Sequence, residues 1–185
     1  QRSTLPVSAH QSQILEACRG HRAAVVTGDA GCGKSTQVPQ YLMDDAPQDG
    51  RAAVVLVTQP RRLAAISVAK RVAAERGEAI GSSVGYHVSG DKKEGDSDRA
   101  RCVYVTTGVL LQLLTHHKDE VLKTYTHLVI DEAHERDVDM DLVLVILRRV
   151  LIDAMRAEQR GERVCVPRMV VMSATVDATR MCRFF

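Results

Sequence analysis

Apolar residues occur along this chain in short continuous runs rather than at every second position. The runs are rich in valine and other apolar residues, and such runs are typical of strands that are buried on both faces of a sheet. Each run is followed by a longer segment of helix-forming composition. The strands that this pattern predicts are Ala23–Gly28, Ala52–Gln59, Val84–Ser89, Cys102–Thr107, Leu128–Asp131 and Met169–Ser173.

The alternation of strands with helical segments predicts an α/β fold: a mostly parallel sheet with helices on both sides, in three layers. Such sheets bind ligands at the carboxyl ends of their strands. Two polar segments are expected at the surface, Gly90–Arg99 as a turn or hairpin and Glu158–Arg163 as a connection. The predicted helices are Lys34–Met43, Leu63–Arg76, Val109–His116 and Met140–Met155.

Length and composition fit one globular domain. The chain has 185 residues, of which 45% are hydrophobic and 26% charged, and its formal net charge is +2. We expect no membrane association, because the apolar run Leu142–Leu147 is far too short for a bilayer span and Gln1–Leu5 does not resemble a secretory signal. The five cysteines include no C-x-x-C pair, which favours a reducing, intracellular location over a disulfide framework or a zinc site.

A glycine-rich segment follows the first predicted strand and leads into a predicted helix. It reads GDAGCGKS and fits the pattern G-x-x-x-x-G-K-[ST], whose backbone N–H groups surround phosphate oxygens. Lys34 would reach the β- and γ-phosphates, and the Ser35 hydroxyl would bind Mg²⁺. The simpler alternative is a glycine-rich turn with a surface lysine. The expected nucleotide contacts are Gly28, Asp29, Ala30, Gly31, Cys32, Gly33, Lys34, Ser35 and Thr36.

Two adjacent acids follow the predicted strand Leu128–Asp131. Asp131 would hold Mg²⁺ beside Ser35, partly through water, and Glu132 would orient and deprotonate the attacking water. A zinc peptidase is not supported, because the pattern H-E-x-x-H that could begin at His134 has Val138 at its last position. The sequence therefore predicts hydrolysis of a nucleoside triphosphate.

Five segments, read in order, carry a family resemblance over nearly the whole chain. GDAGCGKST, TQPRRLAA, TTGVLL, DEAHER and SAT resemble motifs I, Ia, Ib, II and III of DEAH-box RNA helicases. The resemblance implies that residues 1–185 form the first of two RecA-like domains, with ATP bound between the two and the second domain absent from this chain. It also implies movement along single-stranded RNA, usually in the 3′-to-5′ direction.

The resemblance assigns further roles by position. Arg71 lies where the family stacks an arginine on the nucleotide base, which would allow ATP and also other nucleoside triphosphates. His134 would sense the γ-phosphate or pair with the second domain. Ser173 and Thr175 would couple hydrolysis to domain movement. The residues expected to contact the RNA backbone are Arg61, Arg62, Thr106, Thr107 and Gly108.

The sequence departs from the family after Gly85–Val88, where an arginine and an acid often follow. Here the chain continues with Ser89–Lys93. Lys92 and Lys93 could replace the arginine or form a solvated charge run.

The main hypothesis is an ATP-dependent RNA helicase that acts with its second RecA-like and C-terminal domains and, in some cases, an activator protein. An alternative is a non-enzymatic nucleotide-binding scaffold, against which the intact Lys34, Ser35, Asp131 and Glu132 argue. A different P-loop enzyme, such as a nucleotide kinase, would leave TQPRR and DEAHER unexplained. Because the family's transition-state arginines are absent from this chain, we expect the isolated domain to bind nucleotide weakly and to hydrolyse it slowly.

Overall fold

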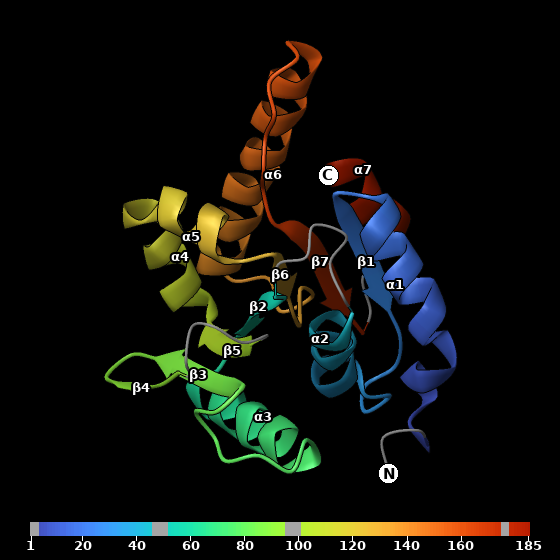
Figure 1. The fold of residues 1–185 in the computed structure, drawn as a ribbon, viewed down its shortest axis with the longest axis vertical. Helices are drawn as coiled ribbons and strands as arrows, with labels where there is room; N and C mark the ends of the chain where they lie inside the picture. Colours follow the sequence, from blue (N-terminus) through green and yellow to red (C-terminus); the bar gives the residue numbers. More distant parts are fainter. Residues whose placement is uncertain (1–3, 46–51, 95–100, 175–177) are drawn as a thin grey trace.

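Seven described strands form one sheet in the order β1-β7-β6-β2-β5-β3-β4, with helices on both faces (Figure 1). The computed structural model describes residues 4–45, 52–94, 101–174 and 178–185. Every neighbouring pair of these strands is parallel except β3 and β4. The strands are β1 (Ala23–Thr27), β2 (Val54–Gln59), β3 (Val84–Val88), β4 (Asp91–Lys93), β5 (Arg101–Thr106), β6 (His127–Ile130) and β7 (Arg168–Ser173).

The helices divide between the two faces because successive strand residues point to opposite sides. Val55 and Val57 pack in one apolar cluster with α1, α2 and α3, whereas Leu56 packs in a second cluster with α4, α6 and α7. The helical elements are η2 (Pro6–His10), α1 (Gln11–Gly20), α2 (Lys34–Asp44), α3 (Arg62–Glu75), α4 (Thr107–His116), α5 (Lys118–Thr124), α6 (Val138–Gln159) and α7 (Ala178–Phe184).

The sheet brings the candidate site residues to one edge. In a parallel register Thr27 of β1 is opposite Ser173 of β7, and Gln59 of β2 is opposite Thr106 of β5. The segments that follow these strand ends are therefore neighbours, although they lie far apart in the sequence. This is the edge at which sheets of this kind bind ligands.

The α/β fold and all six predicted strands are confirmed, with differences of one or two residues at their ends. The helix predicted over Met140–Met155 is longer, since α6 begins after Asp137, whose side chain accepts a hydrogen bond from Met140 N at 2.7 Å. Part of the expected surface connection Glu158–Arg163 therefore belongs to this helix. The helices α1, α5 and α7 were not predicted.

Two further expectations concern segment ends. The segment Gly90–Arg99 does begin as a hairpin, because β4 pairs antiparallel with β3, but residues 95–99 lie outside the described part. Thr107, expected as the end of a strand, is the first residue of α4 instead. Within the described ranges, no helix combines the length and the apolar character that a bilayer crossing requires.

Candidate nucleotide site

The loop between β1 and α2 has the backbone shape that its glycines allow. Gly31 has φ +80° and Gly33 has φ +102°, conformations that side-chain-bearing residues rarely adopt. At the start of the loop, Gly28 N donates a hydrogen bond to Ser173 O at 3.3 Å, which ties the loop to β7. The tip of the loop, from Asp29 to Gly31, is exposed. The loop is therefore open to a ligand and fixed at its base.

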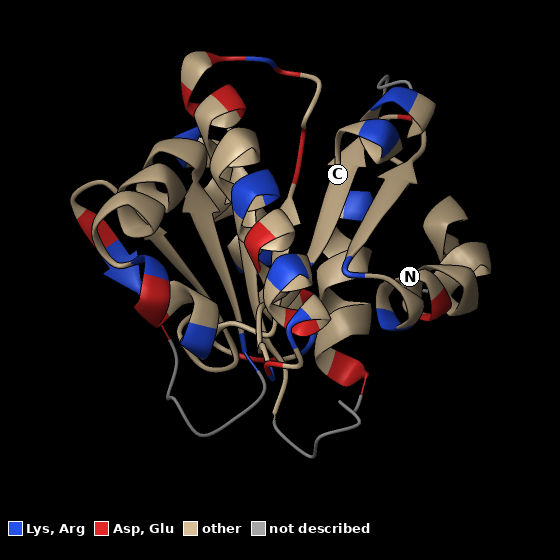
Figure 2. Ribbon diagram, turned by 90° about the horizontal axis from the view of Figure 1, so that it is seen from above, with Lys and Arg blue, Asp and Glu red and all other residues tan. Residues whose placement is uncertain are grey.

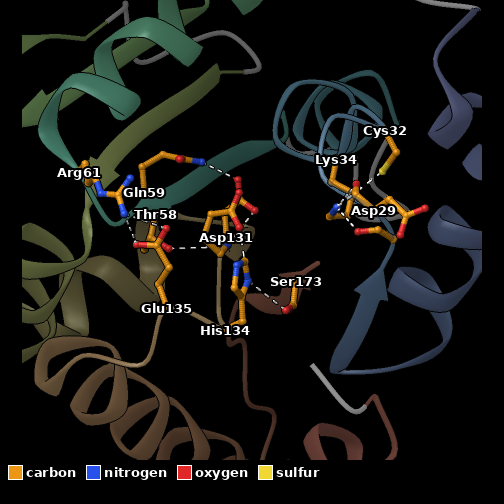
Figure 3. A network of polar contacts seen from close by, with 12 residues as sticks. Asp29, Cys32, Lys34, Thr58, Gln59, Arg61, Asp131, His134, Glu135 and Ser173 are labelled. Carbon is orange, nitrogen blue, oxygen red and sulfur yellow. Dashed lines mark hydrogen bonds and ion pairs between the residues drawn. The ribbon is translucent and has the colours of Figure 1, made fainter. Parts of the chain in front are cut away.

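Lys34 is the first residue of α2, and its side chain lies inside the loop (Figure 3). The residue is only 7% exposed. Its Nζ donates to Gly28 O at 2.5 Å and to Asp29 O at 3.0 Å, and it lies 3.6 Å from Cys32 Sγ. The alternative of a glycine-rich turn with a surface lysine is thus wrong for the lysine, because Lys34 is buried within the loop.

Asp131 follows β6 and is only 1% exposed. Its Oδ2 accepts a hydrogen bond from Gln59 Nε2 at 2.5 Å, and its Oδ1 accepts one from Glu132 N at 2.9 Å. Ser35, in the first turn of α2, lies close enough to this carboxylate to lower its pKa. Burial raises the pKa of Asp131 above its ordinary value, although Ser35 and the hydrogen bond from Gln59 act in the opposite direction. The glycine-rich loop of residues 28–33, called the phosphate loop below, therefore lies next to the acidic turn that begins at Asp131.

The turn after Asp131 is linked to β7. Ala133 N donates to Met172 O at 3.0 Å, and Glu132 adopts a positive φ of 52°. Strained backbone of this kind is concentrated at functional sites. His134 Nδ1 lies 3.3 Å from Ser173 Oγ and 3.4 Å from Glu132 Oε2 (Figure 3). The histidine thus connects the acidic turn to the serine of the SAT segment.

The residues expected to contact RNA lie at the neighbouring ends of β2 and β5. Arg61 is exposed and forms an ion pair with Glu135, with Nη2–Oε distances of 3.0 and 3.2 Å. Arg62, at the start of α3, is also exposed. Thr106 and Thr107 are less exposed than these two arginines.

Thr106 is half-buried, and its side chain accepts a hydrogen bond from Val109 N at 3.4 Å at the start of α4. Thr107 is buried, and its hydroxyl has no hydrogen-bond partner among the described residues. Gly108 is close to α6, since an added Cβ would lie 3.1 Å from Asp139 Oδ2. Thr107 is therefore the most buried of these three residues.

The remaining predicted residues lie further out or outside the described part. Arg71 is on α3 with its side chain 63% exposed, and its Nε donates to Glu75 Oε1 at 3.0 Å. Thr175 is outside the described residues. Sequence reasoning assigned no role to Gln59, which holds Asp131, or to Glu75. Gln59 stands in the TQPRR segment, and its place as the last residue of a strand was the one available indication.

Among the residues that the structure describes, basic and acidic side chains are mixed rather than gathered on one face. Figure 2 shows Lys and Arg interspersed with Asp and Glu over the helices, in keeping with a formal net charge of +2. The electrostatic character of the site therefore depends on individual groups, above all the Lys34 ammonium and the Asp131 carboxylate.

A glycine-rich loop with a buried lysine, in contact with a buried carboxylate at the end of another strand, is the arrangement of a P-loop nucleoside triphosphatase. A family model described as DEAD/DEAH box helicase matches residues 8–183. The chain belongs to the DEAD/DEAH box helicase family.

Individual relatives agree with this assignment. The chain is 42% identical over 182 residues to a probable ATP-dependent RNA helicase spindle-E of Drosophila willistoni and 44% identical over 181 residues to that of Anopheles gambiae. It is 40% identical over 195 residues to a putative DEAH-box ATP-dependent helicase of Mycosarcoma maydis. The matches cover 98%, 97% and 100% of this chain but only 12%, 11% and 12% of those proteins. The chain thus spans about an eighth of the length of these relatives.

Proposed function

We propose that this chain is the first RecA-like domain of an ATP-dependent RNA helicase, which binds ATP with Mg²⁺ and acts with a second RecA-like domain and C-terminal domains. The observation that carries the proposal is the attachment of both segments to the end of β7, where Gly28 N donates to Ser173 O at 3.3 Å and Ala133 N donates to Met172 O at 3.0 Å. It unites the two segments that a P-loop enzyme needs on either side of its cation. The spindle-E and DEAH-box relatives support the assignment.

The residues present fit Mg²⁺, which prefers hard oxygen ligands and binds through one or two carboxylates. Ser35 would bind the ion directly, and Asp131 would hold it partly through water. A carboxylate whose pKa is raised by burial gains a favourable partner when a cation is bound nearby. When bound, Mg²⁺ neutralises negative charge on the β- and γ-phosphates.

The chain's own groups then have distinct tasks. Lys34 would exchange its bonds to Gly28 O and Asp29 O for phosphate oxygens. Glu132 would orient the attacking water and accept its proton. His134, placed between Glu132 and Ser173, would report the state of the γ-phosphate to the SAT segment, in which Thr175 is the proposed partner of Ser173.

RNA would bind at the ends of β2 and β5 through Arg61 and Arg62, with Thr106, Thr107 and Gly108 beside the backbone. Such phosphate contacts carry no sequence information. Movement in the 3′-to-5′ direction and stimulation by an activator protein are part of the same proposal. Arg71 would stack on the base, so that other nucleoside triphosphates would be accepted as well.

The decisive experiment measures ATP turnover, with and without single-stranded RNA, in a longer protein that carries this chain and the second RecA-like domain. We expect RNA-stimulated turnover that Lys34→Ala and Glu132→Gln abolish. Lys118→Ala and Glu120→Gln are the matched controls, because these side chains are exposed on α5 and should leave turnover unchanged. Turnover that RNA does not stimulate would contradict the helicase assignment, and absent turnover would favour a non-enzymatic scaffold.

A further inference from the structure

Glu75, in the last turn of α3, connects two helices through both of its carboxylate oxygens. Its Oε2 accepts hydrogen bonds from Gln37 Nε2 at 2.8 Å and from Gln40 Nε2 at 3.0 Å, and both glutamines belong to α2. Its Oε1 accepts a hydrogen bond from Arg71 Nε at 3.0 Å, one turn earlier on α3. A single carboxylate therefore joins two buried amides to an exposed guanidinium.

The α2 side of this connection is rigidly held. Gln37 and Gln40 are fully buried. Gln37 N donates to Gly33 O at 2.8 Å, and its Nε2 also donates to Thr36 Oγ1 at 3.0 Å. These residues form the first turns of the helix that the phosphate loop enters. The position of the Glu75 carboxylate is thus fixed relative to that loop.

The carboxylate is also suited to hold an arginine. Burial disfavours its charged form, but the hydrogen bonds from Gln37, Arg71 and Gln40 outweigh this and lower the pKa of Glu75 below its ordinary value. The group is therefore ionised at neutral pH. Arg71, by contrast, is largely exposed, and a long exposed side chain loses considerable rotamer freedom when it is ordered. An anchor that orders it in advance reduces the entropy lost when a ligand binds.

We propose that Glu75 is a positioning residue that holds the guanidinium plane of Arg71 at a fixed place relative to the phosphate loop, ready to stack on the base of a bound nucleoside triphosphate. The inference rests on the proposed role of Arg71 in base stacking. In this proposal the side-chain amides of Gln37 and Gln40 fix the Glu75 carboxylate relative to α2. Arg71 is thereby fixed relative to α2 as well.

The test compares the binding of Mg·ATP and Mg·tripolyphosphate to the 185-residue chain by calorimetry. Tripolyphosphate offers the phosphates without a base. The interaction of a guanidinium with an aromatic ring at an exposed site changes the binding affinity by about two- to fivefold. We expect Glu75→Gln to raise the Kd for ATP by about that factor and to leave the Kd for tripolyphosphate unchanged.

The matched control is Glu78→Gln, which removes the same charge near the end of the same helix. Glu78 contacts Ser83 and Arg76 rather than Arg71, so this variant should leave both affinities unchanged. If Glu75→Gln weakens the binding of ATP and of tripolyphosphate equally, Glu75 only supports the structure of the loop, and the proposal is overturned.

Arg71→Ala separates this proposal from the one on which it rests. Arg71→Ala should raise the Kd for ATP by a similar factor. The double variant Arg71→Ala/Glu75→Gln should bind ATP no more weakly than Arg71→Ala alone. If Arg71→Ala leaves ATP binding unchanged, base stacking by Arg71 is wrong. If it weakens ATP binding while Glu75→Gln does not, only the positioning role of Glu75 is wrong.

A measurement on the unmodified chain guards against a variant that fails to fold. The ¹⁵Nε–¹Hε signal of Arg71 should show the relaxation of an ordered group before any nucleotide is added. Relaxation typical of a freely moving side chain would overturn the proposal.

Discussion

Gly31 and Gly33 both have positive φ, but their surroundings differ, and this difference gives a quantitative prediction for alanine substitution. A Cβ added at Gly31 would meet nothing within 4 Å. A Cβ added at Gly33 would lie 3.0 Å from Leu5 Cδ1 and 3.1 Å from Val7 Cγ1. Val7 cannot easily move away, because it is buried and its backbone N donates to Cys32 O at 3.1 Å.

Two costs determine the loss of stability: the left-handed backbone conformation and the steric overlap of the added Cβ. A left-handed backbone costs an alanine about 1–2 kcal/mol at either position. Gly33→Ala adds an overpacking cost of about 1–3 kcal/mol. We therefore expect Gly31→Ala to lower the free energy of unfolding by about 1–2 kcal/mol and Gly33→Ala to lower it by about 2–5 kcal/mol.

Urea unfolding followed by circular dichroism measures these free energies directly, and thermal melts provide a check. For a chain of this size each 1 kcal/mol shifts Tm by roughly 2–4 °C, so Gly33→Ala should melt several degrees below Gly31→Ala. Equal destabilisation by the two substitutions, or a larger effect at Gly31, would refute the packing of the Leu5–Val7 segment against the phosphate loop.

Three further results are expected. Lys34→Ala should abolish the stabilisation of about 2.7 kcal/mol that ATP gives at one hundred times its Kd, as read from melting curves, whereas Lys118→Ala should retain it. Burial, followed by the charge of a nearby arginine, lowers the pKa of His127 from 6.5 to about 4. The folded state then binds fewer protons than the unfolded state, so stability should fall as pH drops from about 6.5 to about 4, and His127→Asn should lose this part of the pH dependence in urea titrations. Glu135→Gln should release Arg61 and tighten RNA binding at low salt in anisotropy titrations; weaker binding would show that the ion pair instead holds Arg61 in its RNA-binding position.

The parallel sheet could be predicted because its strands are continuous apolar runs, a local property of the sequence. The closeness of Ser35 to Asp131 could be expected for a similar reason, since each residue belongs to a recognisable segment at the end of such a run. The fold then brings the strand ends together. Here local pattern and overall topology agree.

Other features depend on tertiary packing and could not be predicted. Helix α1 has no side-chain cap at its start and buries only Ile14 and Cys18, so its sequence pattern is weak. Glu75 meets Gln37 and Gln40 only because α2 and α3 pack on the same face of the sheet. No spacing rule in a single sequence relates residues on separate helices in this way.

A crystal structure of the chain with Mg²⁺ and a non-hydrolysable ATP analogue tests the central claim most directly. We predict that the cation binds Ser35 Oγ and lies within one water of the Asp131 carboxylate. We also predict that Lys34 Nζ has moved from the loop carbonyls to phosphate oxygens. A triphosphate bound elsewhere, or a cation that contacts neither Ser35 nor the water shell of Asp131, would contradict that claim.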